Sequence, residues 1–289
     1  MGASGVELLD LWCRSMKARN FSKTTVASYR RTLGMFLDWI DQETVELAKV
    51  AHGDIDRWLD SRRLGPRSRY GYTSAVATFY AWCCREEHLE HNPALRVDRP
   101  RLGRYLPRPA DPAAVAAALA AAEPREVAMI ALGAMTGLRR GEIPQMRVED
   151  LLLHREPPEV LVHGKGNKER MVPLHESVIA ALRTHGIPKT GWLFPSPTTG
   201  RGLSASHVGK LMTAPFTALE GHVTPHMLRH LFGTTCYEDS GGDLRLVQEL
   251  MGHASPTSTA IYTAFSRPKA ARVVRGLFAL PSRPTPEAA

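Results

Sequence analysis

The chain has few cysteines and no long apolar run. Its 289 residues contain 4 cysteines, of which Cys83 and Cys84 are adjacent and Cys13 and Cys236 stand alone. This spacing provides no CxxC pair, and it excludes a disulfide framework and the usual zinc knuckle. The most apolar stretch, residues 113–122, is mostly alanine and too short to cross a bilayer, and the N-terminus lacks the pattern of a signal peptide. We therefore expect a cytoplasmic protein with reduced thiols and no membrane partner.

Acidic residues are outnumbered by basic ones. The chain has 29 Asp and Glu residues against 37 Lys and Arg residues, a formal net charge of +8. This balance favours a polyanion as partner, although many enzymes of other classes are equally basic. The apolar fraction of 43% and the charged fraction of 23% exclude a disordered or fibrous chain. At roughly 150 residues per domain, the length predicts two domains.

Residues 1–95 predict a compact unit of four helices. The first spans residues 6–18, Ser22 caps the second, the third surrounds residues 55–59, and the fourth begins after Gly65-Pro66 and continues until Asn92-Pro93. A linker over residues 96–109 follows.

The linker is basic and interrupted by prolines, which prevent a regular helix. Its residues Arg99, Arg101 and Arg104 are candidates for contacts along a phosphate backbone, and a solvated tether is the plain alternative.

Residues 110–280 predict a second, mainly helical domain with a small sheet, and residues 281–289 form a tail. A capping Asp111 followed by Pro112 begins its first helix. The alternating patterns within residues 159–173 predict a β-hairpin with lysines at its tip. Further helices are expected to begin at Thr224-Pro225 and Ser255-Pro256. The fold class is therefore mainly α, with a hairpin or three-stranded sheet in the second domain.

Several polar residues of the second domain could form an anion site. Near a predicted helix N-terminus, His226 and Arg229 are three residues apart and share a face, where backbone N–H groups also favour an anion. Taken singly, each candidate has a plain alternative as a surface charge or a core residue. The ordered set consists of Arg139, Lys165, His226, Arg229, His253 and Tyr262.

Four segments around these residues carry a family resemblance: TGLRRGE (136–142), GKGNKERMVPL (164–174), HMLRH (226–230) and LMGHASPTSTAIY (250–262). Over residues 110–265 the sequence resembles the tyrosine recombinases of the phage-integrase family, and the N-terminal unit is similar to the family's core-binding domain. The resemblance implies a two-domain, C-shaped clamp around double-stranded DNA. It implies no cofactor and no metal, because arginines and a lysine stabilise the charge.

The resemblance also assigns roles to the residues. Tyr262 is the expected nucleophile, which forms a 3′-phosphotyrosyl link and releases a 5′-hydroxyl, and Arg139 and Arg229 hold the two non-bridging oxygens. Lys165 is the expected general acid, with Lys168 as the alternative and otherwise a DNA contact. His226 is expected to act on the tyrosine proton or to hydrogen-bond the phosphate, and His253 is expected to donate to a non-bridging oxygen. Glu142 and His230 are expected to support these residues.

Alternatives remain open for several of these residues. Arg140 competes with Arg139, Glu142 could be a helix-surface residue, and His230 could be only a packed core residue. A zinc site of His226 and His230 is disfavoured, because the segment between them has no glutamate base and an arginine would repel the metal. Arg170 is expected to contact the DNA backbone or to be solvated.

The expected function is site-specific recombination through a Holliday junction, most simply by a phage or mobile-element integrase without an arm-binding domain. A Xer-type chromosome or plasmid dimer resolvase is the alternative, and a type IB topoisomerase or a non-catalytic DNA-binding protein is more remote. We expect a homotetramer on paired core sites, in which residues 264–280 dock on a neighbouring protomer, and a directionality factor as a further partner. The two final alanines resemble a degradation tag, although a chance alanine-rich end is commoner.

Overall fold

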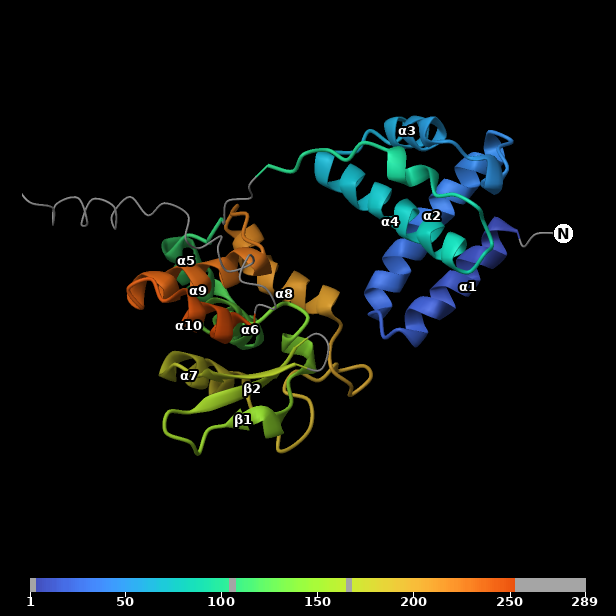
Figure 1. Ribbon diagram of the computed structural model, residues 1–289. Helices are drawn as coiled ribbons and strands as arrows, with labels where there is room; N and C mark the ends of the chain where they lie inside the picture. The colour runs from blue at the N-terminus through green and yellow to red at the C-terminus, as the bar shows by residue number, and fades with distance from the viewer. Residues whose placement is uncertain (1–3, 104–107, 165–167, 253–289) are drawn as a thin grey trace, which may run out of the picture. The chain divides into compact units, whose positions relative to one another are not determined.

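The computed structural model describes residues 4–103, 108–164 and 168–252, and the chain divides into two units, residues 1–104 and 105–289 (Figure 1). Among these described residues, no helix combines the length and the apolar character needed to span a membrane. Helices dominate both units, and one three-stranded antiparallel sheet is found in the second. The predicted fold class is confirmed.

Over residues 4–103, the N-terminal unit consists of four helices and two short 3₁₀ turns. The helices are α1 (Gly5–Ala18), α2 (Lys23–Gln42), α3 (His52–Ser61) and α4 (Pro66–Arg85), and the turns are Leu47–Lys49 and Pro93–Arg96. As predicted, Ser22 caps α2, its hydroxyl accepting from the backbone N–H of Thr25 at 3.1 Å.

The fourth helix is shorter than predicted. It ends at Arg85, because Glu87 turns into the left-handed region at φ 59° and the N–H of His88 donates to the carbonyl of Cys83 at 2.8 Å. The expected stop at Pro93 was therefore wrong, and Pro93 instead begins a 3₁₀ turn.

Aromatic side chains fill the core of the N-terminal unit. Trp12 of α1 stacks on Tyr29 of α2 at 5.5 Å between ring centroids, and Phe36 meets Trp58 edge to face at 5.0 Å. Trp12, Phe36 and Trp58 are fully buried. Such rings dominate core energetics, so apolar packing stabilises this unit.

The second unit is built around a central helix. In the described part of this unit, the helices are α5 (Pro112–Ala121), α6 (Pro124–Thr136), α7 (Glu176–His185), α8 (Ala205–Ala218), α9 (Pro225–Asp239) and α10 (Leu244–Met251). Helix α6 packs against α7, α8 and α9, and its residues Met129, Ile130 and Leu132 are fully buried.

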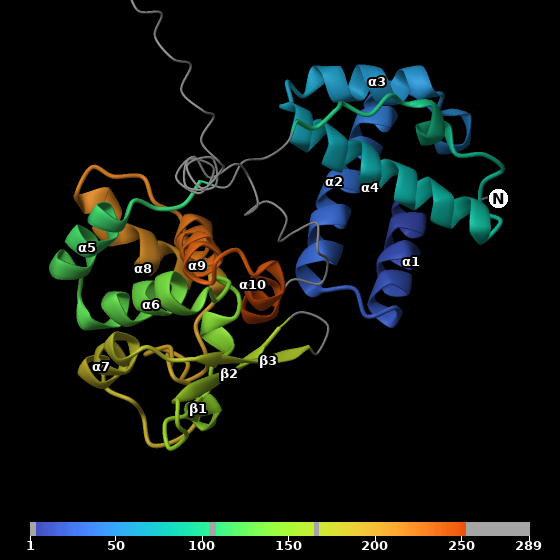
Figure 2. The ribbon, with the colours of Figure 1, turned by 60° about the vertical axis from the view of Figure 1, so that its left-hand side comes forward.

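The sheet has the order β1-β2-β3, with strands β1 (Leu151–Leu152), β2 (Glu159–His163) and β3 (Glu169–Pro173) (Figure 2). The predicted hairpin is formed by β2 and β3, in which Val160 pairs with Val172 and Val162 pairs with Arg170. Val172 and Arg170 therefore lie on the same face of β3, because side chains alternate along a strand.

Glycines end two of the helices that lead into the candidate site. Gly137 after α6 and Gly252 after α10 both have left-handed backbone, at φ 63° and 59°. A β-carbon on Gly137 would lie 2.3 Å from a ring carbon of Phe232, so no other residue fits there without a shift. Arg139 closely follows the first of these glycines and lies near the end of α10, where its Nη2 donates to the carbonyl of Gly252 at 2.8 Å.

Candidate active site

Glu142 is the centre of a buried polar cluster. Its carboxylate accepts from the backbone N–H of Arg139 at 2.8 Å and from Arg139 Nη1 at 2.8 Å. The alternative of a helix-surface glutamate is wrong, since Glu142 is buried at the start of the 3₁₀ turn Ile143–Gln145. The expected first arginine is thus held by its own turn.

Arg170 completes the cluster and was missed by sequence reasoning. Its Nη1 and Nη2 donate to the two oxygens of Glu142 at 3.0 and 2.8 Å, and its Nε donates to the carbonyl of Leu250 at 2.9 Å. Only 9% of its side chain is exposed, so the expectation of a DNA contact or a solvated charge was wrong. The signal was available in β3, where Arg170 shares a face with the buried Val172.

The charges around Glu142 fix its ionisation state. Burial alone would raise the pKa of Glu142, but the hydrogen bonds and charge of Arg170, together with the backbone and side-chain donors of Arg139, outweigh it and lower that pKa. The carboxylate is therefore ionised at neutral pH and holds both guanidinium groups in place.

Arg229 is buried and also contacts the end of α10. Its Nη1 donates to the carbonyl of Gly137, and its Nη2 donates to the carbonyl of Met251 at 2.5 Å. Arg139 Nη2 donates to the next carbonyl, that of Gly252, at 2.8 Å.

Three arginines thus bind three consecutive carbonyls, of residues 250, 251 and 252, at the end of α10. The partial negative charge of a helix C-terminus suits such cations. Because 40% of the Arg139 side chain remains exposed, this cluster can also receive an anion from solvent.

The two histidines of α9 lie next to these arginines. The rings of His226 and His230 meet edge to face at 4.2 Å between centroids. Burial lowers the pKa of His226, and the charges of Arg229 and Arg139 lower it further. Burial, followed by His226 and Arg229, lowers the pKa of His230 to about 4. Both imidazoles are therefore largely neutral at pH 7.

The described part of the chain contains no group of three or more His, Cys, Asp and Glu side chains placed to hold a metal ion. Arg140, the competitor of Arg139, is exposed and lies against Gly209 of α8, where a β-carbon would be 2.7 Å from its Cδ. Only Arg139 of the two joins the cluster.

Of the remaining expected residues, the structure describes only Lys168, Arg99 and Arg101. Lys165, His253, Tyr262 and Arg104 lie outside the described residues, as does the segment 264–280. Lys168 and Arg101 are exposed, and the guanidinium of Arg99 stacks on Tyr70 at 5.5 Å from the ring centroid.

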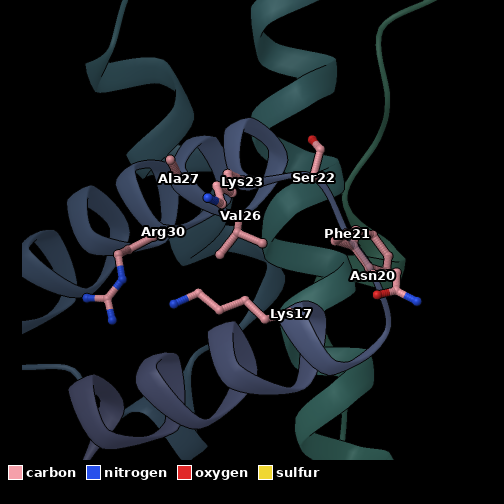
Figure 3. A pocket seen from close by; sticks show the side chains of 8 residues that line it. All are labelled: Lys17, Asn20, Phe21, Ser22, Lys23, Val26, Ala27 and Arg30. Carbon is pink, nitrogen blue, oxygen red and sulfur yellow. The ribbon is translucent and has the colours of Figure 1, made fainter. Parts of the chain in front are cut away.

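A basic hollow lies on the N-terminal unit between α1 and α2. It has a volume of about 790 Å³, and Figure 3 shows Lys17 and Arg30 extending from the two helices into the space between them. Lys23 adds a third cation to its lining. Arg30 forms an ion pair with Asp10, so Lys17 and Lys23 are the main cations with which this hollow can bind an anion.

Comparison with known proteins identifies the family. Residues 111–267 match the phage integrase family, and residues 9–87 match the N-terminal SAM-like domain of phage integrases. Tyrosine recombinase XerD of Caulobacter vibrioides is 35% identical over 238 residues, which cover 75% of this chain and 77% of the relative. Tyrosine recombinase XerC of Xylella fastidiosa is 34% identical over 259 residues, which cover 85% and 87%.

A solved structure shares the fold. The structure of the XerH site-specific recombinase bound to palindromic difH substrate has a TM-score of 0.74 to this chain at 22% identity, and the alignment covers 94% of this chain and 84% of that one. The family match spans more than half of the sequence and includes all four motifs. The chain belongs to the phage integrase family and is a tyrosine site-specific recombinase.

Proposed function

We propose that this recombinase cleaves and rejoins double-stranded DNA through a phosphotyrosine formed at Tyr262. The observation that carries the proposal is the convergence of Arg139 and Arg229 on the end of α10, directly before the segment with His253 and Tyr262. Two planar guanidinium groups match the two non-bridging oxygens of a phosphodiester. Solved relatives are described as bound to DNA, for example XerH with difH substrate and lambda integrase with a COC′ core site.

The proposed step exchanges one phosphate ester for another. The Tyr262 oxygen attacks the scissile phosphorus, its proton passes to a base, and the bond from phosphorus to the 5′-oxygen breaks. The products are a 3′-phosphotyrosine and a 5′-hydroxyl, which receives its proton from Lys165. Attack of a 5′-hydroxyl from the partner duplex reverses the step, so that the ester bond is conserved without ATP.

The lowered pKa of His226 suits the role of base. A neutral imidazole at pH 7 can accept the tyrosine proton, whereas an imidazolium cannot. Arg139 and Arg229 stabilise the charge that builds up on the phosphorane oxygens, each worth about 3–4 kcal/mol of barrier. His253 completes the donor set in this proposal, and His230 supports His226.

Both units take part in DNA binding in this proposal. The basic hollow of the N-terminal unit would hold backbone phosphates with Lys17 and Lys23, while Arg99, Arg101, Arg104 and Lys168 are further candidates. We place the reaction on duplex DNA in the cytoplasm, within a homotetramer on two paired sites.

Two biological roles follow from the family. The relatives named XerC and XerD favour a Xer-type resolvase, and an integrase of a phage or mobile element, assisted by a directionality factor, is the second candidate. A plasmid with two crossover sites distinguishes them. A resolvase converts the plasmid into two circles, each with one crossover site. An integrase recombines a pair of attachment sites and does not act further on the hybrid sites that it produces.

Trapping of the covalent intermediate tests the proposal. Wild-type protein and Tyr262→Phe are incubated with DNA fragments from the gene's genomic surroundings, denatured, and assayed for protein attached to DNA. The proposal expects an adduct with the wild-type chain and none with Tyr262→Phe. The sequence of the attached DNA then defines the crossover site. An adduct that persists in Tyr262→Phe would contradict the assignment of the nucleophile.

A further inference from the structure

Arg170 uses its whole guanidinium group in contacts within the protein. Nη1 and Nη2 bind Glu142, and Nε binds the carbonyl of Leu250, 80 positions further along the chain. The Glu142 carboxylate also accepts hydrogen bonds from Nη1 and from the backbone N–H of Arg139. Arg170 therefore links the turn of Arg139 to the last turn of α10.

The position of Arg170 in β3 ties it to the hairpin as well. It pairs with Val162 in the strand register, and β3 begins directly after the turn that carries Lys165. Pairing with β2 fixes the direction of the side chain, which points to the same face as the buried Val172. A shift of this strand would move both Arg170 and the hairpin tip.

Gly252 leaves room for the Arg170 side chain, and a β-carbon at Gly164 would lie in ordinary contact with the same cluster. A β-carbon on Gly252 would lie 2.9 Å from Arg170 Cδ and 3.1 Å from Nη1. A β-carbon on Gly164 would lie 3.8 Å from Glu142 Oε1 and 3.9 Å from Arg170 Nη1. Gly164 precedes Lys165 and Gly252 precedes His253, so Arg170 lies against the backbone next to both of these residues.

We infer that Arg170 is a positioning residue for strand cleavage, which locks together the three segments that carry Arg139, Lys165 and the His253–Tyr262 pair. The inference rests on the proposed function and adds a residue to it. Arg170 contacts no reacting atom in this account. It acts through Glu142, which orients Arg139, and through Leu250, which fixes the start of the nucleophile segment.

Lysine cannot replace this arginine. A guanidinium group presents its donors in a fixed fork, so that one side chain can reach both oxygens of Glu142 and the Leu250 carbonyl together. An ammonium group is a point charge on a flexible stem, and it would satisfy the carboxylate without bridging to α10. Arg170→Lys therefore keeps the charge near Glu142 and separates positioning from charge balance.

Amide hydrogen exchange of the free protein tests the link without any DNA. In Arg170→Lys, exchange should become at least about tenfold faster in residues 139–142 and 250–252, while α2 and α4 keep their wild-type rates. The matched control is Arg245→Lys, an exposed arginine on α10 whose partner Glu249 is also exposed. Unchanged exchange in both segments would overturn the inference, whatever the activity of the chain.

Single-turnover cleavage tests the consequence. At saturating DNA, the rate of adduct formation by Arg170→Lys should fall about 10- to 100-fold, while its DNA affinity and its final amount of adduct stay near wild type. A general loss of folded protein would reduce the amount of adduct instead. A paired variant, Arg170→Met with Glu142→Gln, removes one positive and one negative charge together, so that the net charge of the cluster stays the same, and it should cleave at least as slowly as Arg170→Lys.

A double-mutant cycle with Arg139→Lys identifies the route. If Arg170 acts through Arg139, the two substitutions together should slow cleavage by clearly less than the product of their separate effects. Fully multiplicative effects, or a wild-type rate in Arg170→Lys, would overturn the inference while leaving the proposed function intact. Failure of the wild-type chain to form any Tyr262 adduct would contradict the proposed function, and the exchange experiment would still decide whether Arg170 makes the link.

Discussion

The two units of the chain bury different kinds of side chain. In the described N-terminal unit, the buried polar residues are Thr32 and Thr73, and every ion pair has at least one exposed partner. The described second unit buries Glu142, Asp150, Arg229 and His230. The first unit therefore keeps its charges at the surface, whereas the second keeps several of them inside.

This difference separates stability from chemistry. Aromatic packing such as Phe36 on Trp58 stabilises the first unit without burying a charge. Buried charges lose their hydration, and their mutual attraction often only offsets that loss. The cluster of Glu142, Arg170 and Arg229 is therefore poorly explained by stability, and we attribute it to the positioning of groups that act on a phosphate.

The largest expected effect comes from the aromatic core. Trp58→Ala should lower the free energy of unfolding of the N-terminal unit by about 3–5 kcal/mol, because it removes a fully buried ring. Hydrogen exchange resolved by segment measures this loss, with the second unit as internal reference. Equal destabilisation of α6 and α9 would show that the two units do not differ in the way we describe.

A change in the buried charge cluster should act on the reaction. Arg229→Lys loses the fork that binds Gly137 and Met251 and should slow adduct formation about 10²–10³-fold. The control is Arg155→Lys, an exposed arginine of the same unit paired with Glu159, which should cleave like wild type. A large loss of folded protein with a normal rate in the remainder would mean that Arg229 serves stability.

The pH dependence of stability should also differ between the units. His230 accepts a proton near pH 6.5 when unfolded but only near pH 4 when folded, so protonation favours unfolding between these values. The stability that this residue contributes is lost as the pH falls from about 6.5 towards 4, and the second unit should lose about 2 kcal/mol between pH 7 and pH 5. The lowered pKa of His226 acts in the same direction.

Urea unfolding at the two pH values measures this loss. His163 opposes it weakly, because a hydrogen bond to Asp150 raises the pKa of this half-exposed imidazole. His230→Asn should remove most of the dependence. An equal slope in the variant would assign the pH response to other groups.

The smallest effect is expected at the basic hollow. Lys17→Gln with Lys23→Gln should weaken DNA binding about tenfold and reduce the slope of log affinity against log salt by about 2. The cleavage rate at saturating DNA should stay unchanged, because both lysines belong to the N-terminal unit. Lys49→Gln, which breaks an exposed pair with Glu46, is the control. An unaltered salt slope would remove this hollow from the DNA interface.

Local patterns predicted most of the fold. Capping residues and first-turn prolines marked the starts of α2, α5 and α9. These signals lie within a few residues of the structure that they determine. The end of α4 was misplaced, because the left-handed turn at Glu87 has no glycine to announce it.

Long-range partners were harder to predict. An arginine in a strand next to a glutamate is typical of a solvated edge, yet Arg170 is buried by Glu142, 28 positions earlier, and by Leu250, 80 positions later. The family motifs selected Arg139, Glu142 and Arg229, which the structure brings together around α10. The roles of Lys165, His253 and Tyr262 stay predictions, because these residues lie outside the described part of the chain.

The most direct test of the account is the chemical identity of the covalent link. The trapped adduct is digested with protease and nuclease, and mass spectrometry locates the nucleotide on the peptide while the free DNA end is labelled. The account predicts a nucleotide joined through its 3′-phosphate to Tyr262, and a 5′-hydroxyl that a kinase phosphorylates without prior phosphatase treatment. A link through a 5′-phosphate, or to another residue of the second unit, would contradict it.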